Sequence, residues 1–351
     1  MNEKCKRAVI FSGGGTRLMI YLGIFAALEE INLKPDILIA SCGGSFAATV
    51  INAFPDHLSR KEYLQSEEYF QFVSGTVFTK HKKLSEIGFF SLKKVFDQRN
   101  APFIEDVFNR YLVELPQDLS ECFPSIKNVQ FSKEIPTVII GSELLFTPKE
   151  SGQPRNEKKL YQKTIFTDTE TANKIKPERL ISNSENYKNS AVEESPKIIT
   201  NFSMLESTRA SVSDMFYVQP AFLHGKYFAG GAIDLVPAEL AQHLAQETIT
   251  EKKQSYNSVE EALVRSVLGF SGNKRLTETE KILTGLQIDT TNIKQELKGH
   301  YLKKGINWKK FEIDFSFPKS YPQFVKDMEI QWQYGFDQTI KSIKADNKYF
   351  N

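Results

Sequence analysis

Residues 7–53 read RAVIFSGGGTRLMIYLGIFAALEEINLKPDILIASCGGSFAATVINA, and this stretch decides the fold. The compact apolar run at residues 7–12 ends in glycines and predicts a buried strand, and a second such run at residues 36–40 predicts another. Between them, residues 18–32 are apolar on nearly every side, which predicts a helix packed inside the protein. Residues 46–53 predict a second helix. Strand, helix, strand, helix in this order predicts an α/β fold with a central, mostly parallel sheet flanked by helices.

Three consecutive glycines, Gly13, Gly14 and Gly15, join the first strand to the first helix. Glycines let the backbone turn tightly and expose its N–H groups at a helix N-terminus, where negative charge is favoured. Phosphate binding and oxyanion stabilisation both use this arrangement. A dinucleotide fingerprint needs glycine where the chain has Leu18, and the Gly-Lys-Ser/Thr of a Walker loop is absent. We therefore interpret the loop as an oxyanion hole, with a purely structural turn as the alternative.

The junction after the second strand has the features of a nucleophile elbow. An elbow places its nucleophile on a sharp turn between a strand and a helix, with small residues two positions before and after it. Two registers fit: residues 43–47 with Ser45 in the centre, and residues 40–44 with Cys42 in the centre. The second is favoured because Cys42 follows the strand directly, whereas Ser45 would lie inside the first helical turn. Cys42 is the predicted nucleophile, and Ser45 is the fallback.

Taken together, these motifs resemble the patatin-like phospholipase family of lipid acyl hydrolases. The glycines followed by Arg17 are similar to the family's oxyanion motif, and a Pro-Asp pair at residues 35–36 is similar to the start of its second strand. Without any gap, the family's serine falls on Cys42, and Gly44 keeps the second elbow glycine. The resemblance implies a patatin-like fold, with substrate contacts from Arg17, Gly43 and Gly44.

The resemblance resumes in the second half of the chain. Residues 209–213 are similar to the family's Arg-Ala-Ser segment. The Asp-Gly-Gly motif then falls on Ala229 and the two glycines after it, so alanine stands where the dyad aspartate is expected. Asp234 is a candidate base if the loop bends, although an aspartate there is more often a turn or cap residue. His224 is a second candidate, although a lone histidine before a loop is usually structural or exposed.

Cysteine in place of serine changes the expected chemistry. A thiolate is the stronger nucleophile and needs less help from a base, and the helix N-terminus after Cys42 is expected to stabilise it. Because thioesters are suited to passing an acyl group onward, the resemblance implies an acyl hydrolase or acyltransferase acting on lipid esters or acyl thioesters. The alternative is a catalytically impaired relative that binds lipid or a protein partner, in which Cys42 only fills a tight turn.

Composition limits the remaining choices. The chain has 351 residues, 40% of them apolar, which is enough for a core without disulfides or a structural metal. With 45 basic and 43 acidic residues, the net charge of +2 gives no electrostatic case for nucleic acid. The sparse, odd set of cysteines, Cys5, Cys42 and Cys122, favours reduced thiols and a cytoplasmic location. No motif predicts a metal or cofactor. No apolar run reaches the roughly 20 residues that span a bilayer, and peripheral membrane contact stays open.

The rest of the chain divides at about residue 240. Residues 1–240 are predicted to form the patatin-like domain, with another central strand at residues 137–140 and a polar insertion at about residues 148–196. Residues 241–351 are predicted to be a mainly helical extension packed on this domain. Near the C-terminus, apolar residues recur every four positions and predict one face of a packed helix: Phe324, Met328, Trp332, Phe336 and Ile340.

Overall fold

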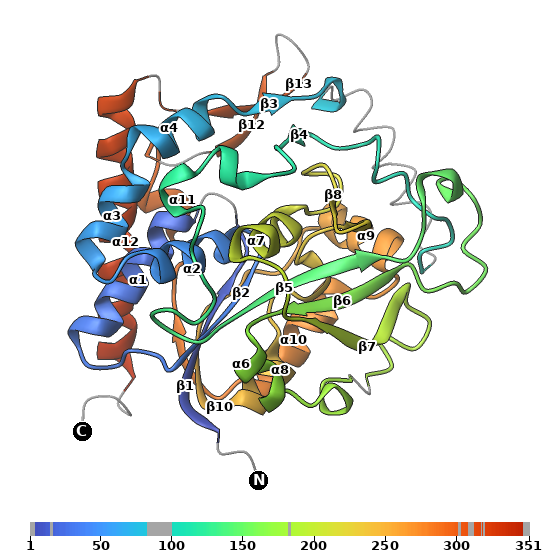
Figure 1. The fold of residues 1–351 in the computed structure, drawn as a ribbon, viewed down its shortest axis with the longest axis horizontal. Helices are drawn as coiled ribbons and strands as arrows, with labels where there is room; N and C mark the ends of the chain where they lie inside the picture. Colours follow the sequence, from blue (N-terminus) through green and yellow to red (C-terminus); the bar gives the residue numbers. More distant parts are fainter. Residues whose placement is uncertain are drawn as a thin grey trace.

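A computed structural model of the chain shows a central sheet flanked by helices (Figure 1). The structure describes residues 4–14, 17–82, 100–181, 184–300, 303–307, 312–316, 318 and 320–346. The strands of the sheet are β1 (Cys5–Ser12), β2 (Ile37–Ser41), β5 (Thr137–Leu144), β6 (Tyr161–Phe166), β7 (Val192–Ile199), β8 (Ala221–Leu223), β9 (Lys226–Phe228), β10 (Ala245–Glu251) and β11 (Gly285–Ile288). Two small antiparallel ladders pair β3 (Val77–Phe78) with β4 (Val113–Glu114), and β12 (Lys303–Asn307) with β13 (Glu312–Ser316).

The α-helices cover both faces and the edges of the sheet (Figure 1). In chain order they are α1 (Leu18–Glu30), α2 (Gly43–Ala53), α3 (His57–Leu64), α4 (Glu67–Ser74), α6 (Thr169–Lys174), α7 (Met204–Val212), α8 (Ala238–Leu244), α9 (Ser258–Leu268), α10 (Gly272–Ile282), α11 (Ile293–Glu296) and α12 (Tyr321–Ala345).

The strand order is β11-β10-β1-β2-β5-β6-β7, and the β8–β9 hairpin joins β5 through β9. Strands β11, β10, β1, β2 and β5 run parallel to one another. The pairing of β5 with β6 is antiparallel, and β6 and β7 are again parallel. The predicted α/β fold with a mostly parallel sheet is confirmed.

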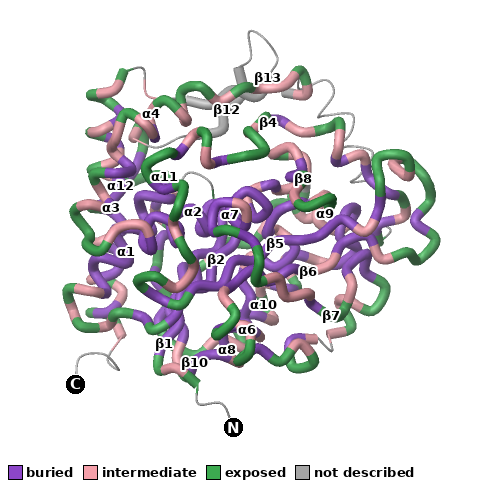
Figure 2. Tube along the Cα trace, in the orientation of Figure 1, coloured by how far each residue is buried: buried purple, intermediate pink, exposed green. Residues whose placement is uncertain are grey.

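The central strands are mostly apolar because both of their faces are covered. On β1, Val9 and Phe11 belong to one apolar cluster, while Ala8 and Ile10 between them belong to the other. The first cluster includes side chains of α1, α2 and α12, and the second includes side chains of α8 and α9. Figure 2 shows the resulting buried centre of the molecule.

The four elements predicted from residues 7–53 are confirmed as β1, α1, β2 and α2, and the predicted strand at residues 137–140 is the first half of β5. The polar segment at residues 148–196 differs from the prediction, because it contributes β6 and the first part of β7 to the sheet. Polar loops on either side of β6 dominate the composition of this stretch and conceal its buried positions. Beyond residue 240, β10 and β11 extend the sheet next to β1, and α9, α10 and α12 supply the helical part.

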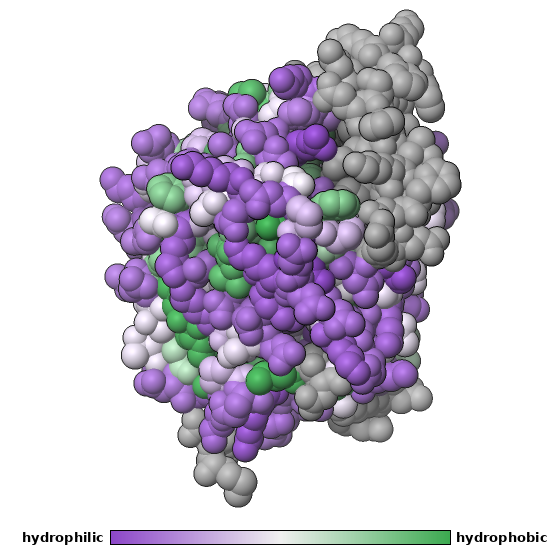
Figure 3. Space-filling view, turned by 90° about the vertical axis from the view of Figure 1, so that its right-hand side faces the viewer, coloured by the Kyte–Doolittle hydropathy of each residue, from purple (hydrophilic) through white to green (hydrophobic). Residues whose placement is uncertain are grey.

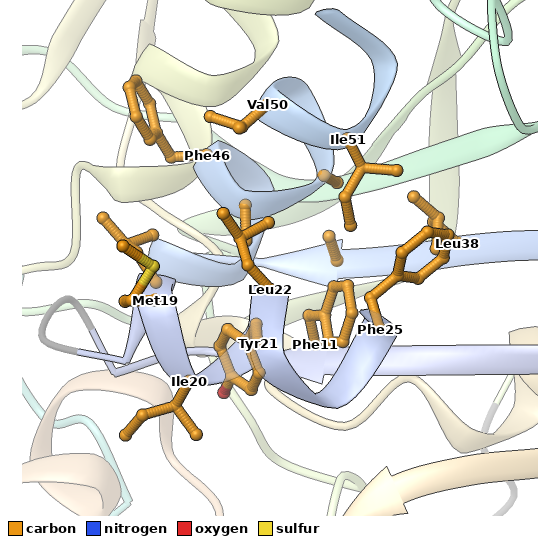
Figure 4. Packing of buried hydrophobic residues seen from close by; sticks show 14 of the residues in the cluster. Phe11, Met19, Ile20, Tyr21, Leu22, Phe25, Leu38, Phe46, Val50 and Ile51 are labelled. Carbon is orange, nitrogen blue, oxygen red and sulfur yellow. The ribbon is translucent and has the colours of Figure 1, made fainter. Parts of the chain in front are cut away.

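Helix α1 is packed on all sides, as its sequence predicts. Figure 4 shows Leu22 and Phe25 of α1 in one cluster with Phe46 and Val50 of α2. On another side, α1 meets α12 so closely that a Cβ on Gly23 would lie 2.0 Å from a backbone oxygen of α12. The helix that follows the glycine loop is therefore held firmly in place.

The C-terminal helix α12 has the apolar face that its four-residue repeat predicts. Phe324 and Trp332 are buried, Met328 and Phe336 pack against the same cluster, and Ile340 is half-buried. A packed terminal helix is thus confirmed.

The outer surface is mainly polar. The face in Figure 3 is largely hydrophilic, with small and separate apolar patches. Among the described residues, no helix combines the length and apolar character needed to cross a membrane.

Candidate active site

Cys42 forms the sharp turn between β2 and α2. Its backbone φ of 49° and ψ of −128° lie in a region that non-glycine residues rarely adopt. Its backbone N–H donates to Ser211 Oγ at 2.9 Å, and Ser211 Oγ in turn donates to Ile140 O at 2.5 Å. Bonds from α7 and β5 therefore hold a strained turn with the strand–turn–helix geometry of a nucleophile elbow.

Ser45 lies inside the first turn of α2, where the register centred on Cys42 puts it. Its hydroxyl donates to Cys42 O at 2.5 Å, and its backbone N–H donates to the same oxygen at 3.0 Å. The side chain is fully buried. Its hydroxyl thus stabilises the elbow backbone.

The side-chain partner of Cys42 is Asp214, which the sequence analysis does not single out. The distance from Cys42 Sγ to Asp214 Oδ1 is 2.9 Å. Asp214 follows the C-terminal end of α7, and its Oδ1 also accepts a hydrogen bond from the backbone N–H of Ala232 at 3.1 Å. A thiol and a carboxylate are therefore in direct contact at the elbow, although the position of the family's usual aspartate is alanine.

The two glycines after Ala229 make room for this contact. Gly230 has a φ of +75°, and a Cβ at this position would lie 2.4 Å from Asp214 Oδ1. A Cβ at Gly231 would lie 2.9 Å from the backbone nitrogen of Cys42. These glycines thus leave the space that the Asp214 carboxylate and the elbow backbone fill.

Burial shapes the electrostatics of the Cys42–Asp214 pair. Burial raises the pKa of Asp214 to about 6, against the lowering effect of its hydrogen bonds to Cys42 and to backbone N–H groups. Burial, followed by the charge of Asp214, raises the pKa of the Cys42 thiol well above its ordinary value. At neutral pH the pair is therefore a thiol beside a carboxylate. This differs from the expected helix-stabilised thiolate because the side chain is only 2% exposed and faces a negative charge.

The other two candidate bases have charged partners of their own. Asp234 has its Oδ2 3.0 Å from Lys163 Nζ and its Oδ1 3.0 Å from a guanidinium nitrogen of Arg275. Burial alone would raise the pKa of Asp234, but these two cations lower it overall. His224 is exposed, with Nε2 2.8 Å from Glu206 Oε1. Within the described ranges, no group of three or more His, Cys, Asp or Glu residues is arranged to hold a metal ion.

The glycine loop lies against the elbow. Gly13 and Gly14 have φ values of 66° and 95°, which residues with a Cβ atom rarely adopt. A Cβ at Gly13 would be 3.8 Å from Cys42 Sγ, and the Gly13 N–H donates to Ser41 O at 3.0 Å. The loop therefore places Gly13 beside the nucleophile and Gly14 directly after it, whereas the predicted donor Gly15 lies outside the described residues.

The remaining predicted substrate contacts have distinct surroundings. Arg17 forms an ion pair with the buried carboxylate of Glu251 and donates its backbone N–H to Gly14 O at 2.9 Å. Gly44 faces the end of β1, where a Cβ would lie 2.0 Å from Phe11 O. Its role is thus close packing under the elbow, as the crowding rule predicts.

A fully buried arginine holds the segment that carries Asp214. Arg209 donates from Nε to Pro116 O at 2.7 Å and from its terminal nitrogens to Gln219 O at 3.2 Å and Leu115 O at 3.3 Å. These acceptors are neutral carbonyl groups, and burial lowers the pKa of Arg209 to about 10. Arg209 therefore joins α7 to the two loops that contain Pro116 and Gln219.

Replacing this arginine is expected to unfold the site. In Arg209→Met three carbonyl groups lose the donor that joins them to α7, so we expect a loss of about 3 kcal/mol or more in the free energy of unfolding, measured by urea denaturation. Arg265→Met is the matched control, because Arg265 is partly exposed and pairs with Glu261 one helical turn away. Equal stabilities of the two variants would contradict a structural role for Arg209.

One feature of the sequence points to Asp214 as a candidate. It stands directly after the segment at residues 209–213 that resembles the family's Arg-Ala-Ser motif. An acidic residue next to a motif placed at the elbow is a candidate partner for Cys42, once the usual position is seen to be Ala229.

The chain is similar to a known protein family and to solved structures. A family model described as patatin-like phospholipase matches residues 9–241. The solved structure of VipD from Legionella pneumophila is 10% identical, with a TM-score of 0.34, over 98% of this chain and 67% of that one. Human GIVD cytosolic phospholipase A2 is 9% identical, with a TM-score of 0.37, over 97% of this chain and 58% of that one. This chain thus spans less than two thirds of the human protein's length. No curated protein matches the sequence at a significant level.

The family match covers the glycine loop, the elbow, Asp214 and Ala229 in one continuous range. It extends over more than half of the chain, and it agrees with the motifs identified in the sequence. The chain therefore belongs to the patatin-like phospholipase family.

Proposed function

We propose that this protein is an acyl hydrolase or acyltransferase that forms a thioester between Cys42 and the acyl group of a lipid ester or acyl thioester. The observation that carries the proposal is the 2.9 Å contact between Cys42 Sγ and Asp214 Oδ1 at a strained elbow beside a glycine loop. Membership of a lipid acyl hydrolase family supports a lipid as the acyl donor. The alternative of a non-catalytic relative rests on the missing carboxylate at Ala229. In this proposal Asp214 supplies a carboxylate at the elbow instead.

The acylation step uses the pair as nucleophile and general base. As Cys42 Sγ attacks the carbonyl carbon, its proton passes to the Asp214 carboxylate. The carbonyl oxygen becomes an oxyanion, and the tetrahedral intermediate then expels the alcohol or thiol, which takes the proton back from Asp214. A pKa of about 6 suits Asp214 to this exchange, because it is ionised at neutral pH yet accepts a proton readily.

Backbone donors stabilise the oxyanion in this scheme. The proposed donors are the N–H groups of Gly14 in the glycine loop and Gly43 directly after the nucleophile. Gly13 is assigned a supporting role, since its N–H is already bonded to Ser41 O. Gly15 stays a predicted donor.

Deacylation repeats the chemistry with a new nucleophile. Asp214 removes a proton from water or from an acceptor alcohol, the oxygen attacks the thioester carbonyl, and Cys42 leaves with the proton from Asp214. Water gives the free acid and an alcohol gives a transferred ester, so the acceptor alone separates hydrolysis from acyl transfer.

Trapping the acyl-enzyme tests the proposal. The purified protein is mixed with a p-nitrophenyl ester of a long-chain fatty acid and analysed by intact mass spectrometry. We expect an added mass of one acyl group, which neutral hydroxylamine removes because it cleaves thioesters. Cys42→Ala is expected to lose the adduct and to lower turnover by at least ~10³-fold.

Ser45→Ala is the control for the competing register. Its hydroxyl bonds to the elbow backbone, so this variant is expected to keep the adduct at Cys42. Loss of the adduct in Ser45→Ala with retention in Cys42→Ala would reverse the assignment. No adduct and no turnover in the unmodified protein would leave a lipid- or partner-binding module.

A further inference from the structure

A buried carboxylate beside the glycine loop has no part in the Cys42–Asp214 pair. Glu251 is the last residue of β10 and is 3% exposed. Since β1, β10 and β11 are parallel neighbours, their carboxyl ends meet at one edge of the sheet. The glycine loop follows β1 at this edge, and Thr290 follows β11 and donates its hydroxyl to Glu251 Oε1. Glu251 thus connects the ends of three adjacent strands.

The carboxylate contacts both sides of the glycine loop. Arg17, after the loop, forms an ion pair with Glu251 Oε1. Tyr21 donates its hydroxyl proton to Gly13 O at 2.6 Å, and the same hydroxyl oxygen lies 3.3 Å from Glu251 Oε2, so the hydroxyl stands between the first residue of the loop and the carboxylate. The ring of Tyr21 is fixed by stacking on Phe11 with centroids 4.8 Å apart (Figure 4). Glu251 is therefore in contact with groups from both sides of the glycine loop: Arg17, which follows it, and Tyr21, which is bonded to Gly13 at its start.

The cluster carries more positive than negative charge. Lys253 Nζ lies 3.0 Å from Glu251 Oε2, so two cations, Lys253 and Arg17, share one carboxylate. Burial lowers the pKa of Lys253, and the charge of Arg17 lowers it further. Without Glu251 these two cations would repel each other, and Arg17 would lose the partner that holds it.

We propose that Glu251 is the positioning residue of the oxyanion loop, which it holds through Arg17 and Tyr21 so that the backbone N–H of Gly14 faces the reacting carbonyl oxygen. This inference rests on the proposed function, because it assigns the loop to an oxyanion. Glu251 does not touch substrate. It acts through the loop, and the loop position sets the rate of acylation.

The sign of the expected effect separates positioning from simple electrostatics. Removing a negative charge near a developing oxyanion would by itself speed acylation. A slower reaction in Glu251→Gln is therefore expected only if the carboxylate holds the loop geometry. Misplacement of a reacting group by about 1 Å costs on the order of 10²-fold in rate, so we expect acylation to slow about 10²-fold.

Two reactions of the same cysteine test the proposal in the full-length protein. Acylation of Cys42 by the p-nitrophenyl ester forms an oxyanion, whereas alkylation of Cys42 by iodoacetamide forms none. Glu251→Gln is expected to slow acylation about 10²-fold and to leave alkylation unchanged or faster. Glu247→Gln is the matched control, because Glu247 lies on the same strand and pairs with Arg7, away from the loop. This control is expected to change neither rate.

Each outcome separates the two proposals. If the unmodified protein is alkylated but never acylated, the proposed function fails. If Glu251→Gln acylates as fast as the unmodified protein, the function stands and the positioning role is overturned. A parallel fall in acylation and alkylation also overturns it, since general damage to the elbow would affect both reactions.

A second variant avoids changing any charge. Tyr21→Phe keeps the stacked ring but removes the hydroxyl between Gly13 O and Glu251, so acylation is again expected to slow while alkylation is unaffected. Because Glu251 acts through Arg17, the effects of Arg17→Met and Glu251→Gln on acylation should not add in the double variant. Additive effects would show that the two residues act independently, which contradicts the proposal.

Discussion

Asp214→Asn is expected to abolish turnover while making the folded protein more stable at alkaline pH. Asparagine has nearly the same shape and keeps an oxygen that accepts the N–H of Ala232 and the thiol of Cys42. It cannot take a proton, so the thiol of Cys42 has no base. Because the pKa of that thiol is already raised by burial, we expect turnover at pH 8 to fall by about 10³-fold or more.

The gain in stability follows from the pKa of Asp214. Its value of about 6 in the folded protein lies above the value of about 3.9 in an unfolded chain, so the folded state binds the proton more tightly. The stability contributed by this group is full below pH ~4 and is lost as the pH rises through about 6. Asparagine does not ionise and loses nothing over this range. We therefore expect Asp214→Asn to be about 1–2 kcal/mol more stable than the unmodified protein at pH 8 and equally stable near pH 4.

Urea denaturation at pH 4.5 and pH 8 checks this prediction, and Asp168→Asn is a control of opposite sign. Burial would raise the pKa of Asp168, but hydrogen bonds from Ser132 and Thr171 lower it overall. Asp168→Asn is therefore expected to lose stability at pH 8, with the loss fading as the pH falls. If Asp214→Asn were less stable than the unmodified protein at pH 8, the ionised carboxylate of Asp214 would not destabilise the folded state. Full turnover in this variant would remove Asp214 as the base.

Gly44→Ala is expected to cost about 3 kcal/mol or more in the free energy of unfolding. A Cβ on Gly44 would lie 2.0 Å from Phe11 O and 2.7 Å from Phe11 C, and both atoms belong to the backbone of a central strand. Neither the strand nor α2 can move freely, because the first is paired on both sides and the second follows the elbow directly. The added methyl group must therefore separate α2 from the sheet.

Gly225→Ala separates crowding from backbone strain. Gly225 has a φ of +76°, so alanine there is strained, but no atom lies within 4 Å of the new methyl group. This control is expected to cost only about 1–2 kcal/mol. We would measure the free energy of unfolding of both variants by chemical denaturation, together with the rate of Cys42 acylation. If Gly44→Ala were no less stable than Gly225→Ala, the close approach of α2 to β1 would be contradicted.

The parts of the site that the sequence predicts are those formed by neighbours in the chain. Cys42 is identified by its distance from the end of a strand and by the glycine two positions later, and the structure places it at the turn. The register with Ser45 in the centre is disfavoured on the same local grounds and stays the alternative. Sequence spacing works here because an elbow is built from a few consecutive residues.

Asp214 could not be found in this way, because 172 positions separate it from Cys42. The family pattern directs attention to Ala229, and only the three-dimensional structure shows that another loop brings a carboxylate into the space beside Gly230. Strand β6 was concealed for a different reason, since it is short and lies between polar loops whose composition outweighs it. Long-range contacts and short elements in polar surroundings are thus what the sequence leaves undetermined.

The raised pKa of Cys42 has a consequence for how this protein tolerates oxidants. Peroxides attack thiolates far faster than thiols, and a cysteine nucleophile kept as a thiolate is therefore at risk of oxidation to sulfenic and sulfinic acids. Here the side chain is buried and its pKa is raised, so the proton stays on sulfur at neutral pH. If Asp214 removes that proton only during attack on a carbonyl, as proposed, we expect peroxide to oxidise Cys42 more slowly than a cysteine kept as a thiolate.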